Sequence, residues 1–550
     1  MQNAAIYFHH NAFDTTTGRL LGRHAAGESF LRGFLRHADV DRFHLWNAIG
    51  QGEADRNALI DRIEPPTKPV RWVGPMDRAL LVDPGVLSIP GPGLPDEAWS
   101  RSGVGPGAYA ICGLTHTTAT EAVMGIVPNL LISPTEDYDA LICTSSAVRA
   151  SVETQLDGVR DYLVQEFGPR RRAEPQRVTI PLGINTADYA TSPEQRAKWR
   201  ERLGIPETAA VALYVGRFNV LEKMNPALMA IALEQAAEVL GQPLYWVNAG
   251  WAEAAADEEV YHRETAALCP TVHYLNVDGR EPDVRFSIWS VADFFISFSD
   301  NIQETFGLTP VEAMAAGLPC VVTDWNGYKD TVRHGEDGFR VPTVAPHPGA
   351  GGDLSFRFTN KWITYSNYVG AAAQYVAIDY AAAVTAICAL AGDVDLRLRL
   401  GRQAQARARS VFDWAAIIPQ YQALWAEQNA RRLAAPPQVG VQDNPFRPDP
   451  YRLFANYPTR HLVLEDQLTL SPGMTWERAS ALLASPLAVY SRVNRPTNFE
   501  VETIVAWLEN RPGASVADLL AVFPQNRRPF IRRGVLWIAR YGVISIRSPG

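Results

Sequence analysis

The sequence contains little cysteine and no long apolar run. Its five cysteines are widely spaced, odd in number and mostly embedded in apolar stretches (Cys112, Cys143, Cys269, Cys320 and Cys388). This pattern predicts reduced core residues rather than a disulfide framework or a metal site. Nowhere do about eighteen apolar residues follow one another, and the N-terminus lacks the basic and apolar segments of a signal peptide. We therefore expect no membrane span and a cytoplasmic location.

An excess of positive charge is also absent. The formal net charge is −8 and the isoelectric point is about 5.8. Proteins that bind nucleic acid normally show a basic face and a raised isoelectric point, so nucleic acid is not an expected partner of the whole chain. The basic stretch 170–172 and the helix with Phe30 and Phe34 are predicted to face a polymer, a protein or an anionic membrane, the last as peripheral contact at the inner membrane face.

The length of the chain exceeds what one hydrophobic core usually serves. At about 150 residues per domain, 550 residues suggest three or four units. Short apolar runs alternate with helical patterns through the first four fifths of the chain, which predicts an α/β fold with two doubly wound parallel sheets. The predicted strands are 5–8, 109–114, 140–143 and 177–183 in the first half, and 211–215, 244–248, 271–275, 293–298 and 320–323 in the second.

Two carboxylates, Glu304 and Glu312, flank a glycine-containing turn at the start of a predicted helix. The turn is Thr305, Phe306, Gly307 and Leu308, and it follows the predicted strand 293–298. The free N–H groups and the positive dipole end of such a helix form an anion site that suits a diphosphate. Ionised carboxylates accept hydrogen bonds, so the two glutamates are suited to the hydroxyls of a sugar and a ribose. Alternatively, Glu312 closes a capping box with Thr309 as the N-cap and needs no ligand.

These motifs resemble a known family of enzymes. The segments 304–312, 313–319 and 335–339 together are similar to the E-x7-E region of family 4 retaining glycosyltransferases of the GT-B fold. The resemblance covers roughly the first four fifths of the chain. It implies an N-terminal Rossmann-like acceptor-side domain over residues 1–190 and a nucleotide-sugar-binding Rossmann-like domain over 191–435. A helix at 413–430 is then expected to return to the N-terminal domain.

The resemblance also implies a catalytic set of residues. Arg217 and Lys223 follow a predicted strand and match the cations that stabilise the leaving diphosphate. His116 also follows a strand and matches a histidine near the donor sugar, while Glu304 binds sugar hydroxyls. Each basic residue has a plainer alternative: His116 as a structural histidine, and Arg217 and Lys223 as solvated loop charges.

The implied donor-binding set comprises Glu312 on the ribose, the turn 305–308 on the diphosphate, and one loop glycine. That glycine is Gly22, with Gly18 as its competitor. The resemblance implies retention of anomeric configuration, with no side chain acting as nucleophile. No metal or other cofactor is expected, because the helix start and two cations serve the diphosphate.

The implied function is transfer of a sugar from a nucleoside-diphosphate sugar to a hydroxyl of a glycan, a lipid-linked acceptor or a protein. Two alternatives remain. One is an inactive nucleotide-sugar-binding regulator whose output passes through the C-terminal part of the chain. The other is a GT-B epimerase or phosphorylase, and a phosphorylase should depend on added phosphate or a lysine-bound cofactor.

Residues 436–550 follow a proline-rich linker and fall outside the resemblance. Helical periodicity at 498–508, 516–523 and 531–540, with a short strand at 542–547, predicts a small helical module similar to a winged helix. Its arginines at 527, 528, 532, 533 and 540 form a predicted basic face. DNA binding is one interpretation. We favour the other, a homo-oligomer or protein contact through residues 440–550, because the shape alone does not establish its use.

Overall fold

The computed structural model describes residues 3–14, 22–169, 173–281, 283–436, 444–491 and 495–548. It divides into two compact units, Met1–Gln442 and Asp443–Gly550. The basic stretch 170–172 and the competitor Gly18 lie outside the described residues. None of the helices in the described part of the chain is long and apolar enough to cross a membrane.

The first unit begins with a seven-stranded parallel sheet in the order β3-β2-β1-β4-β5-β6-β7. The order reverses between β1 and β4, which makes that edge the switch point where doubly wound sheets bind ligands. The strands are β1 (Ala5–Phe8), β2 (Phe43–Asn47), β3 (Val70–Val73), β4 (Val86–Ser88), β5 (Ala110–Leu114), β6 (Ala140–Cys143) and β7 (Gln176–Thr179). The intervening helices are α1 (His10–Phe13), α2 (Gly22–His37), α3 (Glu53–Ile63), α4 (Leu94–Ser102), α5 (Glu121–Asn129) and α6 (Ser146–Phe167).

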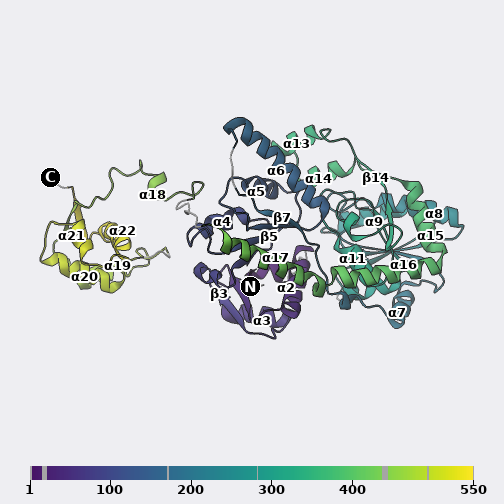
Figure 1. Cartoon of the computed structure of the whole chain (residues 1–550), viewed down its shortest axis with the longest axis horizontal. Helices are drawn as coiled ribbons and strands as arrows, with labels where there is room; N and C mark the ends of the chain where they lie inside the picture. The colour runs from purple at the N-terminus through teal and green to yellow at the C-terminus, as the bar shows by residue number, and fades with distance from the viewer. Residues whose placement is uncertain are drawn as a thin grey trace. The chain divides into compact units, whose positions relative to one another are not determined.

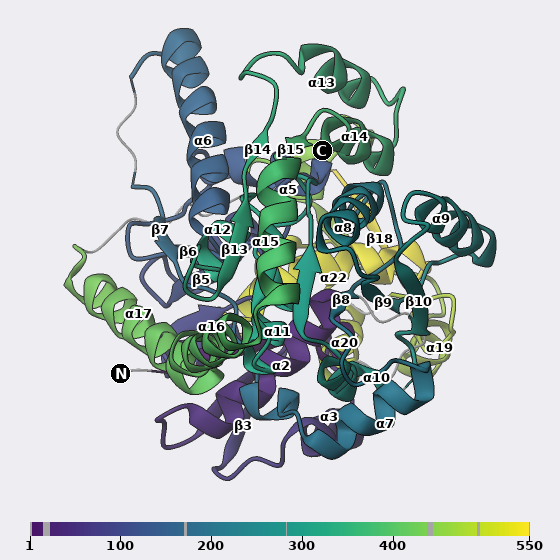
Figure 2. The same cartoon turned by 90° about the vertical axis from the view of Figure 1, so that its right-hand side faces the viewer.

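A second parallel sheet has six strands in the order β10-β9-β8-β11-β12-β13, with its switch point between β8 and β11. Helices α8 and α15 lie side by side against it (Figures 1 and 2). The strands are β8 (Val211–Val215), β9 (Tyr245–Gly250), β10 (His273–Asp278), β11 (Phe294–Ser297), β12 (Cys320–Thr323) and β13 (Gly338–Val341). The larger helices are α7 (Pro193–Leu203), α8 (Ala227–Leu240), α9 (Ala255–Ala267), α11 (Leu308–Ala315), α15 (Tyr380–Gly392) and α16 (Val394–Arg407).

Smaller elements complete this half of the unit. They are α10 (Val284–Ser287), α12 (Tyr328–Thr331), β14 (Thr343–Val344), α13 (Gly352–Thr359), α14 (Tyr365–Ala373) and β15 (Ala377–Ile378). The apolar strands are buried on both faces between helices, as the central strands of parallel sheets are. The predicted α/β class with two doubly wound domains, the GT-B arrangement, is confirmed.

Helix α17 (Trp414–Ala434) follows the second sheet but packs on the first. Figure 1 shows it, in green, lying among the purple elements of the N-terminal domain next to α2. Its buried Trp414 ring meets Phe30 of α2 edge to face, with 5.5 Å between centroids. The fully buried Gln428 donates hydrogen bonds to the carbonyls of Ile111 and Tyr138, each 3.0 Å long. Both ends of α17 are therefore tied to the first sheet.

The α2 face that carries Phe30 and Phe34 belongs to this core. Phe34 is fully buried and packs on Trp425 of α17, with 5.9 Å between ring centroids. Phe34 is therefore covered by protein and does not face a polymer or a membrane, whereas Phe30 is half-buried. The apolar residues of this helix face pack against α17, which lies about 400 positions later in the sequence.

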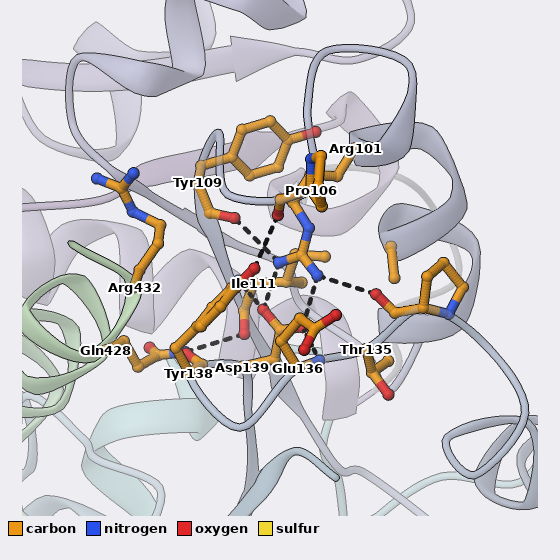
Figure 3. A network of polar contacts seen from close by, with 12 residues as sticks. Arg101, Pro106, Tyr109, Ile111, Thr135, Glu136, Tyr138, Asp139, Gln428 and Arg432 are labelled. Carbon is orange, nitrogen blue, oxygen red and sulfur yellow. Dashed lines mark hydrogen bonds and ion pairs between the residues drawn. The ribbon is translucent and has the colours of Figure 1, made fainter. Parts of the chain in front are cut away.

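A buried ion pair lies at the amino ends of β5 and β6, away from the switch point of the first sheet (Figure 3). Arg101 on α4 reaches both carboxylate oxygens of Asp139, at 2.6 and 2.9 Å, and both side chains are almost fully buried. Asp139 also accepts from the backbone N–H groups of Ile111 and Glu136, each at 2.8 Å. Its oxygens are thus occupied by structural partners, which fits a role in holding β5 and β6 rather than a metal.

The second unit is a small domain around one antiparallel sheet in the order β17-β16-β18. The strands are β16 (Gln467–Leu470), β17 (Ala514–Ser515) and β18 (Ile544–Arg547), and the helices are α18 (Pro450–Leu453), α19 (Trp476–Leu483), α20 (Asn498–Glu509), α21 (Val516–Ala521) and α22 (Arg528–Arg540). Helices α19, α20, α21 and α22 contribute to a core that includes Ile504, Leu519 and Ile538. The predicted small helical module is confirmed, although its central strand β16 was not predicted.

The predicted basic face of this unit is partly occupied by internal contacts. Arg527 binds both oxygens of Glu500, at 2.7 and 2.8 Å. Arg528 and Arg532 donate to the carbonyls of Phe523 and Leu462. Hydrogen bonds from Arg527 lower the pKa of Glu500 to about 2 despite its burial. Arg527 therefore belongs to an ion pair within this unit, although its side chain stays partly exposed.

Candidate active site

The predicted site residues of the second domain lie at the carboxyl ends of β8 and β11. These two strands are neighbours and flank the switch point of the second sheet. Gly216 and Arg217 follow β8, and the loop 298–307 follows β11. The strand order thus brings together two segments about 80 residues apart in sequence. This edge is where open α/β sheets bind their ligands.

Lys223 and Glu304 form an ion pair at this edge. The Nζ of Lys223 lies 2.6 Å from Oε2 of Glu304, and both side chains are largely shielded from solvent. The Thr305 N–H donates to Oε1 of Glu304 over 3.2 Å. Burial raises the pKa of Glu304, but Lys223 and the backbone N–H groups of Thr305 and Phe306 more than offset it, so the pKa lies below its ordinary value. Glu304 is therefore held as a carboxylate that accepts hydrogen bonds.

The turn after Glu304 leads into α11 through Gly307. Gly307 is the N-cap and has a φ of +88°, in the left-handed region that glycine adopts without strain. A Cβ at this position would lie 2.2 Å from the ring of Tyr328, so a larger residue does not fit. The capping-box alternative, with Thr309 as N-cap, is wrong, because α11 begins at Leu308 and no side chain caps it.

Glu312 points instead to a tyrosine from the link between the two domains. Tyr189 Oη donates to Oε1 of Glu312 over 2.8 Å. Burial raises the pKa of Glu312, and the Tyr189 hydrogen bond with the charges of Arg285 and Lys223 opposes this only in part. A polar cavity of about 110 Å³ is lined by Glu312 and Arg285 from the second domain and by Glu28 and Arg32 from α2. The second carboxylate therefore faces the space between the domains.

Glu304 faces a different and larger space. An interdomain cleft of about 570 Å³ is lined by Glu304, Thr305 and Lys329 on one side and by Thr118 and Gln155 on the other. Thr305 lines this cleft whereas Leu308 lines the smaller cavity of Glu312. The turn 305–308 thus stands between two spaces, with one carboxylate on each side.

Hydrogen bonds hold the domains together beside the cleft. The hydroxyl of Ser145 donates to the carbonyl of Thr305 over 2.7 Å. The hydroxyl of Ser146 donates to Oδ1 of Asp330, also over 2.7 Å. Because Thr305 belongs to the proposed phosphate turn, the N-terminal domain directly contacts the segment predicted to bind the donor.

The remaining predicted cation, Arg217, lies near Glu222 rather than Glu304. Their closest nitrogen–oxygen distance is 3.5 Å, and Glu222 also accepts from Ser366 of α14 over 2.6 Å. Arg217 directly follows Gly216 at the end of β8. A Cβ at Gly216 would lie 2.5 Å from the Tyr214 hydroxyl. Arg217 is therefore held at the switch point, on the same loop as Lys223.

His116 lies in the first domain, outside the cleft that Glu304 lines. Its Nε2 is 2.9 Å from the Pro90 carbonyl, and since a carbonyl only accepts, Nε2 carries the proton. The ring lines a cavity of about 380 Å³ at the switch point of the first sheet. Thr118 and Ala119, two and three residues further on, line the Glu304 cleft. The loop after β5 thus forms a wall of both spaces. Gly22 begins α2, whose residues line the cavities of His116 and Glu312.

Asp300 is a buried acid in the β11 loop that the motif reasoning missed. It is 4% exposed, and its Oδ1 has no hydrogen-bond partner within the described part of the chain. Burial raises its pKa to about 7, against the opposing effect of a backbone hydrogen bond. Its place four residues before Glu304 was visible in the sequence, but its burial was not. Similarly, no spacing rule connects Tyr189 to Glu312.

Metal ligands do not gather at these loops. Within the described residues, no group of three or more His, Cys, Asp or Glu side chains is placed to hold a metal ion. Asp137 is exposed while Asp139 is paired with Arg101, so this D-x-D sequence does not present two carboxylates to one point.

The segment that carries this geometry matches a known family. Residues 195–347 match the family described as "Glycosyl transferases group 1", and this range includes Arg217, Lys223, Glu304 and Glu312. This segment is similar to group 1 glycosyltransferase domains. Its two carboxylates and two cations lie on the loops after β8 and β11 and on α11.

Relatives with a similar sequence carry glycosyltransferase names. The chain is 30% identical over 191 residues to a D-inositol 3-phosphate glycosyltransferase of Nocardioides, covering 32% of this chain and 40% of the relative. It is 28% identical over 248 residues to one from Thermobispora bispora, covering 43% of this chain and 55% of the relative. The chain therefore spans about half of these relatives' own length.

Solved structures with a similar chain path include HepE of Anabaena in complex with UDP and glucose. That chain is 17% identical, with a TM-score of 0.46, and the match covers 77% of this chain and all of HepE. A sucrose-phosphate synthase from Thermosynechococcus elongatus is 16% identical, with a TM-score of 0.47, covering 78% of this chain and all of the synthase.

Proposed function

We propose that this chain is a retaining glycosyltransferase that moves a sugar from a nucleoside-diphosphate sugar to a hydroxyl acceptor. The observation that carries the proposal is the Lys223–Glu304 pair beside the Gly307 turn, at the switch point of a domain similar to group 1 glycosyltransferases. An ionised carboxylate, a cation and a helix start within one loop cluster provide for sugar hydroxyls and for phosphate. The names of the sequence relatives support the same reaction class.

Each predicted residue then has a role in binding the donor. The diphosphate lies on the turn Thr305–Leu308 with Arg217 and Lys223, and Glu304 accepts hydrogen bonds from the sugar. Glu312 accepts from the ribose on the other side of the turn. Gly22 lets the N-terminal backbone approach the diphosphate, and His116 hydrogen-bonds a hydroxyl of the donor sugar.

The transfer itself needs no protein nucleophile. The bond between the anomeric carbon and the diphosphate oxygen breaks while the acceptor oxygen attacks from the same face, and the acceptor proton passes to the departing phosphate oxygen. Negative charge grows on that oxygen, so fixed cations in a cleft of low water content lower the barrier. Arg217 and Lys223 supply those charges. Activity is expected to persist in the presence of a chelator.

A thermal-shift and hydrolysis screen with UDP-, GDP-, ADP- and TDP-sugars tests this proposal. A donor that binds only the folded protein raises its melting temperature by mass action. We expect one donor to respond and to release free sugar slowly, and we expect the product glycoside to keep the donor's anomeric configuration. Binding without turnover would favour the regulatory alternative, and dependence on added phosphate would favour a phosphorylase.

Glu304→Ala tests the site within that screen. It is expected to abolish turnover without unfolding the protein, since Glu304 is the one carboxylate among the described residues that line the cleft. Glu238→Ala, at an exposed position of α8, is the matched control and is expected to retain full activity. Normal turnover by Glu304→Ala would refute the assignment.

For the C-terminal unit we propose contact with protein, either a partner or a second copy, rather than with duplex DNA. Three of its five predicted arginines already have partners within the unit. A mobility-shift titration of the full chain with duplex DNA at 50 and 200 mM salt tests this, because phosphate contacts make affinity fall steeply with salt. Salt-sensitive binding would overturn the proposal.

A further inference from the structure

The first domain contains a cavity at its own switch point. Its volume is about 380 Å³, within the range of about 300–1,000 Å³ typical of small-molecule sites. The wall begins with Ile6 and Tyr7 of β1, Ser88 of β4 and Cys112 of β5. These strands flank the point where the strand order reverses. The first sheet thus presents a ligand-sized space at the edge where such sheets bind ligands.

The lining of this cavity is mainly apolar. Phe13 and Phe30 come from the helices after β1, and Ile89, Leu114 and Ile142 come from the strand ends. Trp414 and Tyr421 of α17 complete the lining of this cavity. Among the described lining residues there is no arginine or lysine, and the titratable nitrogen groups are His9 and His116. A phosphate in this space would be desolvated with no permanent cation beside it among the described lining residues, at a large cost in free energy.

The cavity adjoins the cleft that contains Glu304. Both spaces share the loop after β5, since His116 lines the cavity and Thr118 lines the cleft. A molecule in the cavity therefore lies across one short loop from the carboxylate to which a donor sugar is assigned.

We propose that this cavity binds the acceptor and that the acceptor is a small alcohol with an apolar body. This inference rests on the proposed function. The apolar body occupies the space between the β1, β4 and β5 ends and α17, and its hydroxyl lies toward His116 and the cleft. In the transfer, the alcohol oxygen forms a bond to the anomeric carbon, the bond from that carbon to the diphosphate oxygen breaks, and the alcohol proton goes to that phosphate oxygen.

Two kinds of apolar alcohol satisfy this chemistry, aromatic and aliphatic. The full-length protein with its responding donor should be offered 2-naphthol, 1-octanol, glucose and myo-inositol 1-phosphate, with the glycoside products quantified. We expect 2-naphthol or 1-octanol to form a glycoside and to speed donor consumption. Which of the two does so distinguishes an aromatic from an aliphatic acceptor. Glycosylation of inositol phosphate or glucose, with neither apolar alcohol accepted, would overturn the inference.

Calorimetric titration of 2-naphthol and of 1-octanol without donor separates this inference from the proposed function. Binding is expected even in the absence of turnover, because the cavity exists without the donor. If no sugar nucleotide binds but one of the two alcohols does, the proposed function fails while the apolar site stands. If a donor is hydrolysed but neither alcohol binds, the apolar site fails and the transferase assignment stands.

Ile89→Trp places extra bulk in the cavity from the end of β4. It is expected to weaken binding of the responding alcohol about tenfold or more. Ile132→Trp is the matched control, because the same change then falls on an exposed position of the same domain. Unchanged affinity in a folded Ile89→Trp protein would contradict the site. The wild-type titrations decide the matter if that variant does not fold.

Discussion

Tyr189 donates a hydrogen bond to Glu312 over 2.8 Å, from the link between the domains to the first helix after the phosphate turn. The contact fixes one oxygen of a carboxylate whose pKa burial raises. The Tyr189 contact gives Glu312 a structural role, and the ribose contact that we propose would fall to its other oxygen.

We expect Glu312→Gln to weaken donor binding about tenfold or more with little change in melting temperature. The amide oxygen still accepts from Tyr189, but the charge that strengthens a bond to a ribose hydroxyl is gone. Calorimetry with the responding donor and a melting curve measure the two effects. A lowered melting temperature with unchanged donor affinity would assign Glu312 a purely structural role.

Tyr189→Phe should give the opposite pattern. It leaves a buried carboxylate oxygen without its donor, which costs about 1–3 kcal/mol of unfolding free energy. Urea unfolding of the full chain measures this loss. Donor affinity should change less than in Glu312→Gln, since the carboxylate itself remains.

Lys223→Met is expected to lower turnover about 100-fold or more and to change the pH dependence of what remains. Without the cation, only the N–H groups of Thr305 and Phe306 oppose the effect of burial, so the pKa of Glu304 rises. The acidic limb of the rate profile, below which Glu304 is protonated, should therefore move to higher pH.

A pH profile of donor consumption between pH 4 and 8 checks this expectation for Lys223→Met. Lys223→Arg keeps the charge and should keep the acidic limb near its wild-type position. Lys198→Met, on an exposed part of α7, is the control for loss of a lysine. An acidic limb that stays in place in Lys223→Met would remove Glu304 from the titrating step.

Much of the fold around the Lys223–Glu304 pair was predictable from the sequence. The apolar runs at 5–8, 140–143, 211–215 and 320–323 are strands over those same residues. Strands β2, β3 and β4 escaped prediction. β4 has three residues after a Pro84–Gly85 turn, and β3 carries Arg71 and Trp72 on a half-exposed edge. Short or edge strands with polar residues give little periodic signal.

The site was predictable as a set of residues but not as an arrangement. Lys223 and Glu304 meet because β8 and β11 are neighbours, and sequence alone does not give strand order. The same limit hid the partner of Glu312, which lies 123 positions earlier in the chain. It also hid the cavity around His116, whose wall includes Trp414 from the returning helix.

Asp300→Asn should stabilise the protein at alkaline pH. Burial raises the pKa of Asp300 to about 7 in the folded protein, far above the value of a solvated aspartate. The folded state then binds a proton that the unfolded state does not bind between about pH 4 and 7, so wild-type stability falls as pH rises through this window.

The amide of Asp300→Asn has no proton to lose. At pH 8 we expect this variant to be more stable than the wild type by an amount on the order of 4 kcal/mol, falling to about 1–2 kcal/mol at pH 5. Denaturant unfolding at the two pH values measures this. Asp137→Asn, at an exposed position of the first domain, should show no such pH-dependent gain. A gain of equal size at both pH values would mean that Asp300 does not titrate in this window.

The Arg101–Asp139 pair offers a test of what holds the first sheet together, away from the chemistry. Arg101→Met leaves Asp139 almost fully buried without its cation, with only the Ile111 and Glu136 N–H groups to compensate (Figure 3). Breaking one partner of such a pair costs about 3–5 kcal/mol, whereas replacing both with apolar residues is often nearly neutral. The double variant Arg101→Met/Asp139→Leu should therefore be more stable than Arg101→Met alone.

Urea unfolding of the single and double variants measures the difference, and donor binding at the distant switch point should survive in the double variant. A double variant that is less stable than Arg101→Met would show that Asp139 stabilises β5 and β6 mainly through the two backbone N–H groups rather than through Arg101.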